Sequence, residues 1–97
     1  WEDLKPRTIA ASNVRAALTL VERAEADAGI VYYSDALTSQ KVSICFKINP
    51  DDHAPIVYPL AILKAAPHPV TARKFLWFLE GETAKAVFAK YGFNLIL

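Results

Sequence analysis

The sequence predicts an α/β fold in which helices flank a mixed, mostly parallel sheet. Two observations support this class. Residues 7–33 read as a strand, an amphipathic helix and a second strand, which is the order of a βαβ unit. Later in the chain, two apolar strand-like runs precede two segments with helical periodicity. With 97 residues, 54% of them hydrophobic and 22% charged, the chain suits a small folded unit.

The first helix is predicted to begin directly after Asn13. An asparagine side chain can accept a hydrogen bond from a free N–H group in the first helical turn. Val14, Ala17, Leu18 and Val21 then follow at positions i, i+3, i+4 and i+7, which places them on one helical face. The helix therefore presents the free amides of its first turn at its start.

Two strands are predicted on either side of this helix, over residues 7–10 and 29–33. The second is an apolar, β-branched and aromatic run of the kind that parallel sheets bury. If the two strands are parallel neighbours, the connection between them is right-handed.

The rest of the chain predicts two more strands and two helices. The strands cover residues 41–48 and 56–63, and Pro59 inside the second predicts an edge, a bulge or a bend. One helix is expected over residues 70–80. A second helix follows and ends at Gly92, which suits a left-handed C-terminal cap.

The βαβ unit places two candidate ligand groups at one edge of the predicted sheet. The helix starts at Val14, just beyond the first strand, and Tyr32 lies at the carboxyl end of the second strand. Ligands of open α/β sheets bind at this edge, and a helix N-terminus there offers N–H groups to an anion. The simpler alternative is that Val14 only packs into the core and that Tyr32 only satisfies its hydroxyl locally.

Several segments resemble, in the same order, the C-terminal portion of the periplasmic molybdate-binding proteins of ABC importers. The segments are Asn13-Val14-Arg15-Ala16-Ala17-Leu18, Val21-Glu22-Arg23, Gly29-Ile30-Val31-Tyr32, Ser34-Asp35-Ala36, Pro50-Asp51-Asp52-His53, Ile56-Val57-Tyr58-Pro59-Leu60-Ala61 and Phe88-Ala89-Lys90-Tyr91-Gly92-Phe93. The order and spacing of many pieces carry the resemblance.

The resemblance implies a solute-binding component of an ABC transporter that binds molybdate, and also tungstate, for import. The oxyanion ligands that it implies here are the backbone N–H of Val14 and the hydroxyl of Tyr32. Further ligands, chiefly two serines, would come from an N-terminal lobe that no segment of this chain matches. It also implies a periplasmic location, a membrane permease as partner, no enzymatic activity and no cofactor.

The resemblance also implies a domain organisation. The chain would be a C-terminal fragment of a two-lobed, periplasmic-binding-protein-like fold. Residues 1–55 would form the βαβ portion of one ligand lobe, residues 56–63 a return strand at the hinge, and residues 64–97 the C-terminal helices.

Composition argues against several other classes of function. The net charge is +1 and the charges are interspersed, so the basic stripe expected of a nucleic-acid-binding protein is missing. The apolar runs are shorter than the roughly 20 residues that cross a bilayer. Cys45 is single and reads as a small buried hydrophobe. No metal site is expected at His53 beside Asp51 and Asp52, because neighbours within a turn rarely converge on one ion.

Two alternative functions stay open at this level. One is a ligand-sensing effector domain of the same fold in a transcription regulator, which would need a DNA-binding segment elsewhere. The other is a small α/β enzyme, which would need a convergent set of acid and base groups that the sequence does not offer.

Overall fold

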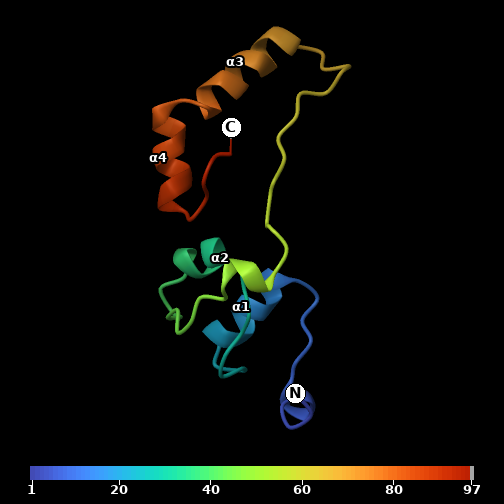
Figure 1. Ribbon diagram of the computed structural model, residues 1–97, viewed down its shortest axis with the longest axis vertical. Coiled ribbons are helices and arrows are strands. Elements are labelled where there is room, and N and C mark those ends of the chain that lie inside the picture. The colour runs from blue at the N-terminus through green and yellow to red at the C-terminus, as the bar shows by residue number, and fades with distance from the viewer. Residues whose placement is uncertain (97) are drawn as a thin grey trace. The chain divides into compact units, whose positions relative to one another are not determined.

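The computed structural model describes residues 1–96, in which four α-helices and two short 3-10 helices form (Figure 1). In chain order the elements are η1 (Lys5–Arg7), α1 (Val14–Glu22), α2 (Tyr33–Thr38), η2 (Pro50–Asp52), α3 (Pro69–Leu79) and α4 (Glu82–Lys90). The chain divides into two compact units, Trp1–Lys47 and Ile48–Leu97. Residue 97, the last of the expected C-terminal helical segment, lies outside the described residues.

The first helix begins at the predicted residue. Asn13 is its N-cap in an extended conformation, and the Asn13 side chain accepts a hydrogen bond from the backbone N–H of Ala16 at 2.8 Å. Leu18 is buried with 4% of its surface exposed, and Val14, Ala17 and Val21 are half-buried on the same face. The predicted cap and the predicted inward face of α1 are both confirmed.

Helices α1 and α2 are joined near both of their ends. Near their starts, the Arg15 guanidinium lies 3.6 Å from the Asp35 carboxylate. Near their ends, the Ser39 hydroxyl donates a hydrogen bond of 2.5 Å to the Glu22 carboxylate. Because start meets start and end meets end, the two helices run side by side in the same direction.

The chain between these helices has to run back along α1. Gly29 lies against it so closely that an added Cβ would be 3.0 Å from a methyl group of Val21. From Val21 back to Val14 the helix measures about 10 Å, and three extended residues beyond Gly29 cover about the same distance. Tyr32 ends this segment three residues before Asp35, whose carboxylate contacts Arg15 at the start of α1.

The second unit contains two contacting helices, α3 and α4, with Gly81 as the N-cap of α4. The predicted helices are confirmed to within a residue or two. Gly92 adopts φ 84° directly after α4. The N–H of Gly92 donates to the carbonyl of Ala89 and the N–H of Phe93 to that of Phe88, the paired bonds of a Schellman cap.

The predicted strands are not formed within residues 1–96, so the helical part of the α/β prediction is confirmed and the sheet is not. Arg7 belongs to η1 and Tyr33 to the first turn of α2. The segments 7–10, 29–33, 41–48 and 56–63 otherwise carry no regular structure or only short helical turns at their edges. A strand exists only through the ladder with its neighbour, and among the described residues these segments have no such neighbour.

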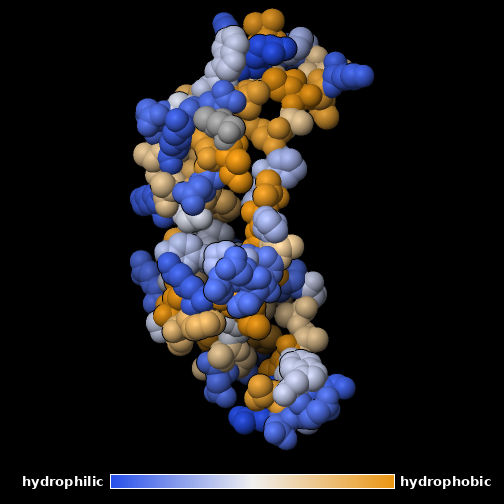
Figure 2. Space-filling model, viewed as in Figure 1, coloured by the Kyte–Doolittle hydropathy of each residue, from blue (hydrophilic) through white to orange (hydrophobic). Residues whose placement is uncertain are grey.

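The structure leaves much apolar surface exposed. The accessible surface is 8710 Å², whereas two compact units of half this mass would together expose about 6,600 Å². Figure 2 shows apolar side chains at the surface, and the extended segment 56–63 contributes Tyr58, Leu60 and Leu63, which are 61–77% exposed. Such an apolar surface is typical of a face that another part of a protein covers.

Two expectations about buried side chains are wrong for this structure. The aromatic residues of α3 were expected to pack in a core, but Phe75, Trp77 and Phe78 are each more than half exposed, and Phe75 and Phe78 stack on one another. Cys45 was expected to be buried and is exposed. The inward face of α3 is instead formed by half-buried Ala72, Leu76 and Leu79, because only one face of this helix contacts other elements.

Candidate functional site

The N-terminus of α1 supplies the backbone donors of the candidate site. The first N–H groups of a helix have no acceptor within the helix. Asn13 accepts from two amides: its side chain from Ala16, and its carbonyl from Ala17 at 3.1 Å. The helix leaves the preceding amides, those of Val14 and Arg15, for other acceptors. The positive end of the helix dipole lies at the same place and favours an anion.

Tyr32 lies where the chain changes from extended to helical. It is the N-cap residue of α2, with φ −69° and ψ 146°, and 40% of its surface is exposed. Along the segment before it, Val31 is half-buried, whereas Ile30 and Tyr32 are exposed. This alternation is the period of an extended chain, so Ile30 and Tyr32 lie on one face of the segment and Val31 on the other.

The ion pair of Arg15 and Asp35 links the first turns of α1 and α2, next to the two candidate ligands in the sequence. Arg15 directly follows Val14, and Asp35 lies in the first turn of α2, three residues after Tyr32. Sequence reasoning identified Val14 and Tyr32 but did not assign a role to this pair. The sequence shows opposite charges at the second residue of α1 and the third residue of α2, but this pattern alone does not specify that the two side chains meet.

The arrangement favours binding an anion rather than reacting with it. The candidate donors are an amide N–H and a phenol hydroxyl, and the two formal charges beside them belong to one ion pair. Tyr33, next to Tyr32, makes a cation–π contact: the Lys47 ammonium lies 4.1 Å from the centre of its ring. Uncharged donors of this kind can satisfy the oxygens of an anion without adding a counter-charge.

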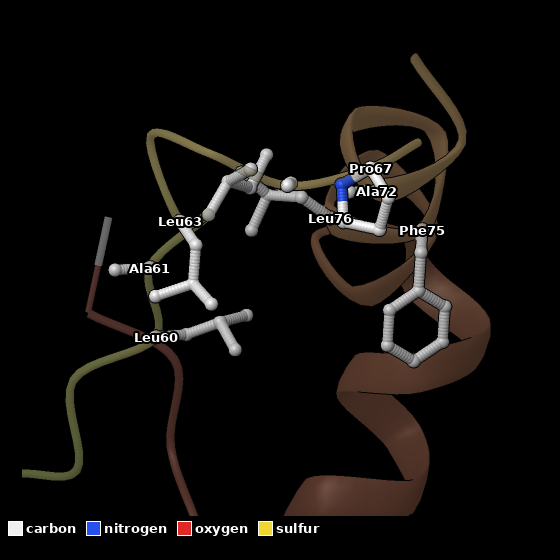
Figure 3. Close-up of a pocket in the computed structure, with 9 residues that line it drawn as sticks. Leu60, Ala61, Leu63, Pro67, Ala72, Phe75 and Leu76 are labelled. Atoms are coloured by element: carbon white, nitrogen blue, oxygen red, sulfur yellow. The ribbon is translucent and has the colours of Figure 1, made fainter. Parts of the chain in front are cut away.

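A separate apolar pocket of about 260 Å³ lies in the second unit (Figure 3). Leu60, Ala61 and Leu63 approach it from the extended segment, and Phe75 and Leu76 from α3. All nine lining residues are apolar, the remaining four being Ile62, Ala66, Pro67 and Ala72. The lining side chains offer no donor for an oxyanion, so this pocket is a poor candidate for the same ligand.

The turn at Asp51, Asp52 and His53 does not assemble a metal site. The imidazole of His53 is 2.8 Å from the carbonyl of its neighbour Ala54. Across residues 1–96 no three side chains of His, Cys, Asp or Glu converge closely enough to hold a metal ion. None of the helices in the same residues combines the length and the apolarity that a membrane span requires.

Comparison with known families identifies the class of protein. The family model described as bacterial extracellular solute-binding protein matches residues 1–94. This match covers nearly the whole chain, including α1, α2 and the segment between them. The chain therefore belongs to this family of solute-binding proteins.

Individual relatives include proteins named as molybdate-binding proteins and as an ABC transporter substrate-binding lipoprotein. The chain is 45% identical over 94 residues to the molybdate-binding protein ModA of Haemophilus influenzae, and 39% identical over 95 residues to ModA of Escherichia coli K12. It is 43% identical over 94 residues to a Bacillus subtilis protein, YvgL, named as an ABC transporter substrate-binding lipoprotein. These alignments cover 97–98% of this chain but only 36–37% of each relative. No solved structure matches the chain.

Proposed function

We propose that this chain belongs to the solute-binding component of an ABC importer and forms part of a site for a tetrahedral oxyanion. Molybdate is the proposed ligand, and tungstate, which has the same shape and charge, is expected to bind as well. The observation that carries the proposal is the position of Val14 at the first residue of α1, with its amide left over by the Asn13 cap. The identity to molybdate-binding proteins supports the choice of ligand.

The chemistry of the donors favours a fully ionised dianion. Molybdate presents only acceptors, so the Val14 amide and the Tyr32 hydroxyl can each donate to it. Monohydrogen phosphate carries a proton that needs an acceptor, and a site made only of donors leaves that proton unpaired at a cost of about 1–3 kcal/mol. Sulfate is a bare dianion as well, so the site must exclude it by size.

The proposed site needs more protein than these residues. Val14 and Tyr32 belong to one unit, Trp1–Lys47, and would form one wall of a cleft. The opposing wall, with further donors, is proposed to be an N-terminal lobe of the same protein. Residues 56–63 would return between the lobes as a strand, and residues 64–97 would form the C-terminal helices. The exposed apolar side chains of segment 56–63 support this proposal, because a neighbouring strand or lobe would cover them.

The proposed setting is the space outside the cytoplasmic membrane. In this setting the loaded protein would deliver its oxyanion to a membrane permease. The relatives are named as binding proteins, which favours a role without catalysis over the small-enzyme alternative. They equally favour transport over the effector domain of a transcription regulator.

Calorimetry on the full-length protein tests the proposed function. Molybdate and tungstate are expected to bind tightly, and sulfate and phosphate at least tenfold more weakly. The isolated 97-residue chain is expected to bind molybdate weakly or not at all, because an anion held on one side stays in water, where each contact contributes little. Circular dichroism of the isolated chain verifies that its helices form. Tight, selective binding by the isolated chain would contradict the proposed second wall.

Replacing Tyr32 by phenylalanine tests the hydroxyl. The substitution removes one hydrogen bond to a charged ligand, which is expected to weaken molybdate binding by about tenfold or more. Tyr33→Phe in the same protein is the matched control, since it removes a neighbouring hydroxyl and keeps the ring beside Lys47. If Tyr32→Phe leaves the affinity unchanged, Tyr32 is not a ligand.

Replacing Val14 by proline tests the amide. Proline removes the N–H group but suits the first position of a helix, and Asn13 already has the extended conformation that a residue before proline prefers. Molybdate binding is expected to fall at least tenfold with Val14→Pro and to change little with Val14→Ala. Equal losses in both variants would mean that the valine side chain, and not its amide, matters.

A further inference from the structure

The stability of α1 alone does not explain why Arg15, the cation of the Arg15–Asp35 pair, lies in the first turn of that helix. Arg15 is the second residue of α1, where the positive end of the helix dipole disfavours a cation. No acidic residue lies in the first turn of α1 to compensate. The compensating charge comes from another helix, from Asp35 in the first turn of α2, where a carboxylate is favoured.

The pair connects the two turns that hold the proposed ligands. One partner adjoins Val14 and the other lies one helical turn beyond Tyr32. The segment between the helices, from Arg23 to Tyr32, contains no regular secondary structure that would fix this spacing. A direct link between the two turns is therefore the shortest path by which the position of Val14 can be coupled to that of Tyr32.

We propose that Arg15 and Asp35 are positioning residues that set the distance between the amide of Val14 and the side chain of Tyr32. This inference rests on the proposed function. Neither residue touches the oxyanion. Asp35 holds the Arg15 guanidinium and balances its charge. The pair therefore fixes the spacing of the two ligands and adds little net electrostatic potential at the site.

The surroundings of the pair make this role separable from folding. The two side chains are 69% and 23% exposed, and an ion pair with this much access to water contributes little to global stability. If the pair is lost, the bond between Glu22 and Ser39 still links α1 to the end of α2. Loss of the pair is therefore expected to loosen the start of the helices while their other ends stay attached.

A double-mutant cycle in the full-length protein tests the proposal with molybdate as the probe. Arg15→Gln and Asp35→Asn are each expected to raise the Kd about fivefold. The double variant is expected to bind no more weakly than either single variant, because one link can be broken only once. Arg15→Lys, which keeps a charge that can reach Asp35, is expected to restore most of the affinity.

A second ion pair, directly after the C-terminal end of α1, provides the matched control. Arg23 and Glu25 lie 2.9 Å apart at the far end of α1, and both are exposed. Arg23→Gln and Glu25→Gln change the net charge of the protein as the test variants do, and are expected to leave the molybdate Kd within about twofold. Melting temperatures of all variants are expected to stay close to that of the wild type.

The sign of the Asp35→Asn effect separates positioning from simple electrostatics. If the pair acted only through its field, removing the negative charge would tighten binding of a dianion while Arg15→Gln weakened it. Opposite signs, or losses that add in the double variant, would overturn the positioning role while leaving the proposed function intact. A wild-type protein that binds neither molybdate nor tungstate would overturn both.

Discussion

The attachment of α2 to α1 is the constraint on which the candidate site depends. The contact from Arg15 to Asp35 and the bond from Ser39 to Glu22 fix two helices in the same direction. Two successive helices that run the same way require the chain between them to return, and Gly29 allows that return to pass close to Val21. Tyr32 ends this return and caps α2, whose first turn contacts the first turn of α1 through Asp35 and Arg15.

The exposed apolar surface is connected to the proposed second lobe. Only Leu18 and Ala84 are buried hydrophobic residues among those described. Large apolar side chains on segment 56–63 and on α3 face water instead, and covering them would stabilise the fold by about 25 cal/mol for each Å² of apolar surface buried. In our proposal, one second lobe would both cover this apolar surface and supply the second wall of the site.

Local signals predicted α1, α3 and α4, because helices form from contacts within a few residues, whereas α2 was not predicted. Asn13, the spacing of Val14 to Val21, and Gly92 each act within their own turn, and all three behave as predicted. The predicted strands did not form among residues 1–96, because a strand depends on a partner that can be distant in sequence. The run that ends at Tyr33 illustrates the difference: its last residue joins α2.

In the candidate site, too, local features could be predicted from the sequence and contacts between helices could not. Val14 could be located from the sequence because a cap specifies where the helix starts, and that start is confirmed. The ligand roles of Val14 and Tyr32 stay predictions. The ion pair of Arg15 and Asp35 could not be assigned beforehand, since it depends on the relative direction of two helices joined by a segment of irregular structure. Similarly, the exposure of Phe75 and Trp77 depends on what covers α3 and not on helical spacing.

A crystal structure of the full-length protein with bound molybdate tests the central claim most directly. We predict one oxyanion with an oxygen about 2.7–3.2 Å from the amide nitrogen of Val14 and another oxygen at a similar distance from the hydroxyl of Tyr32. The remaining oxygens should be held by donors from a second lobe. A molybdate ion bound away from the start of α1, or one held by charged side chains without either residue, would contradict it.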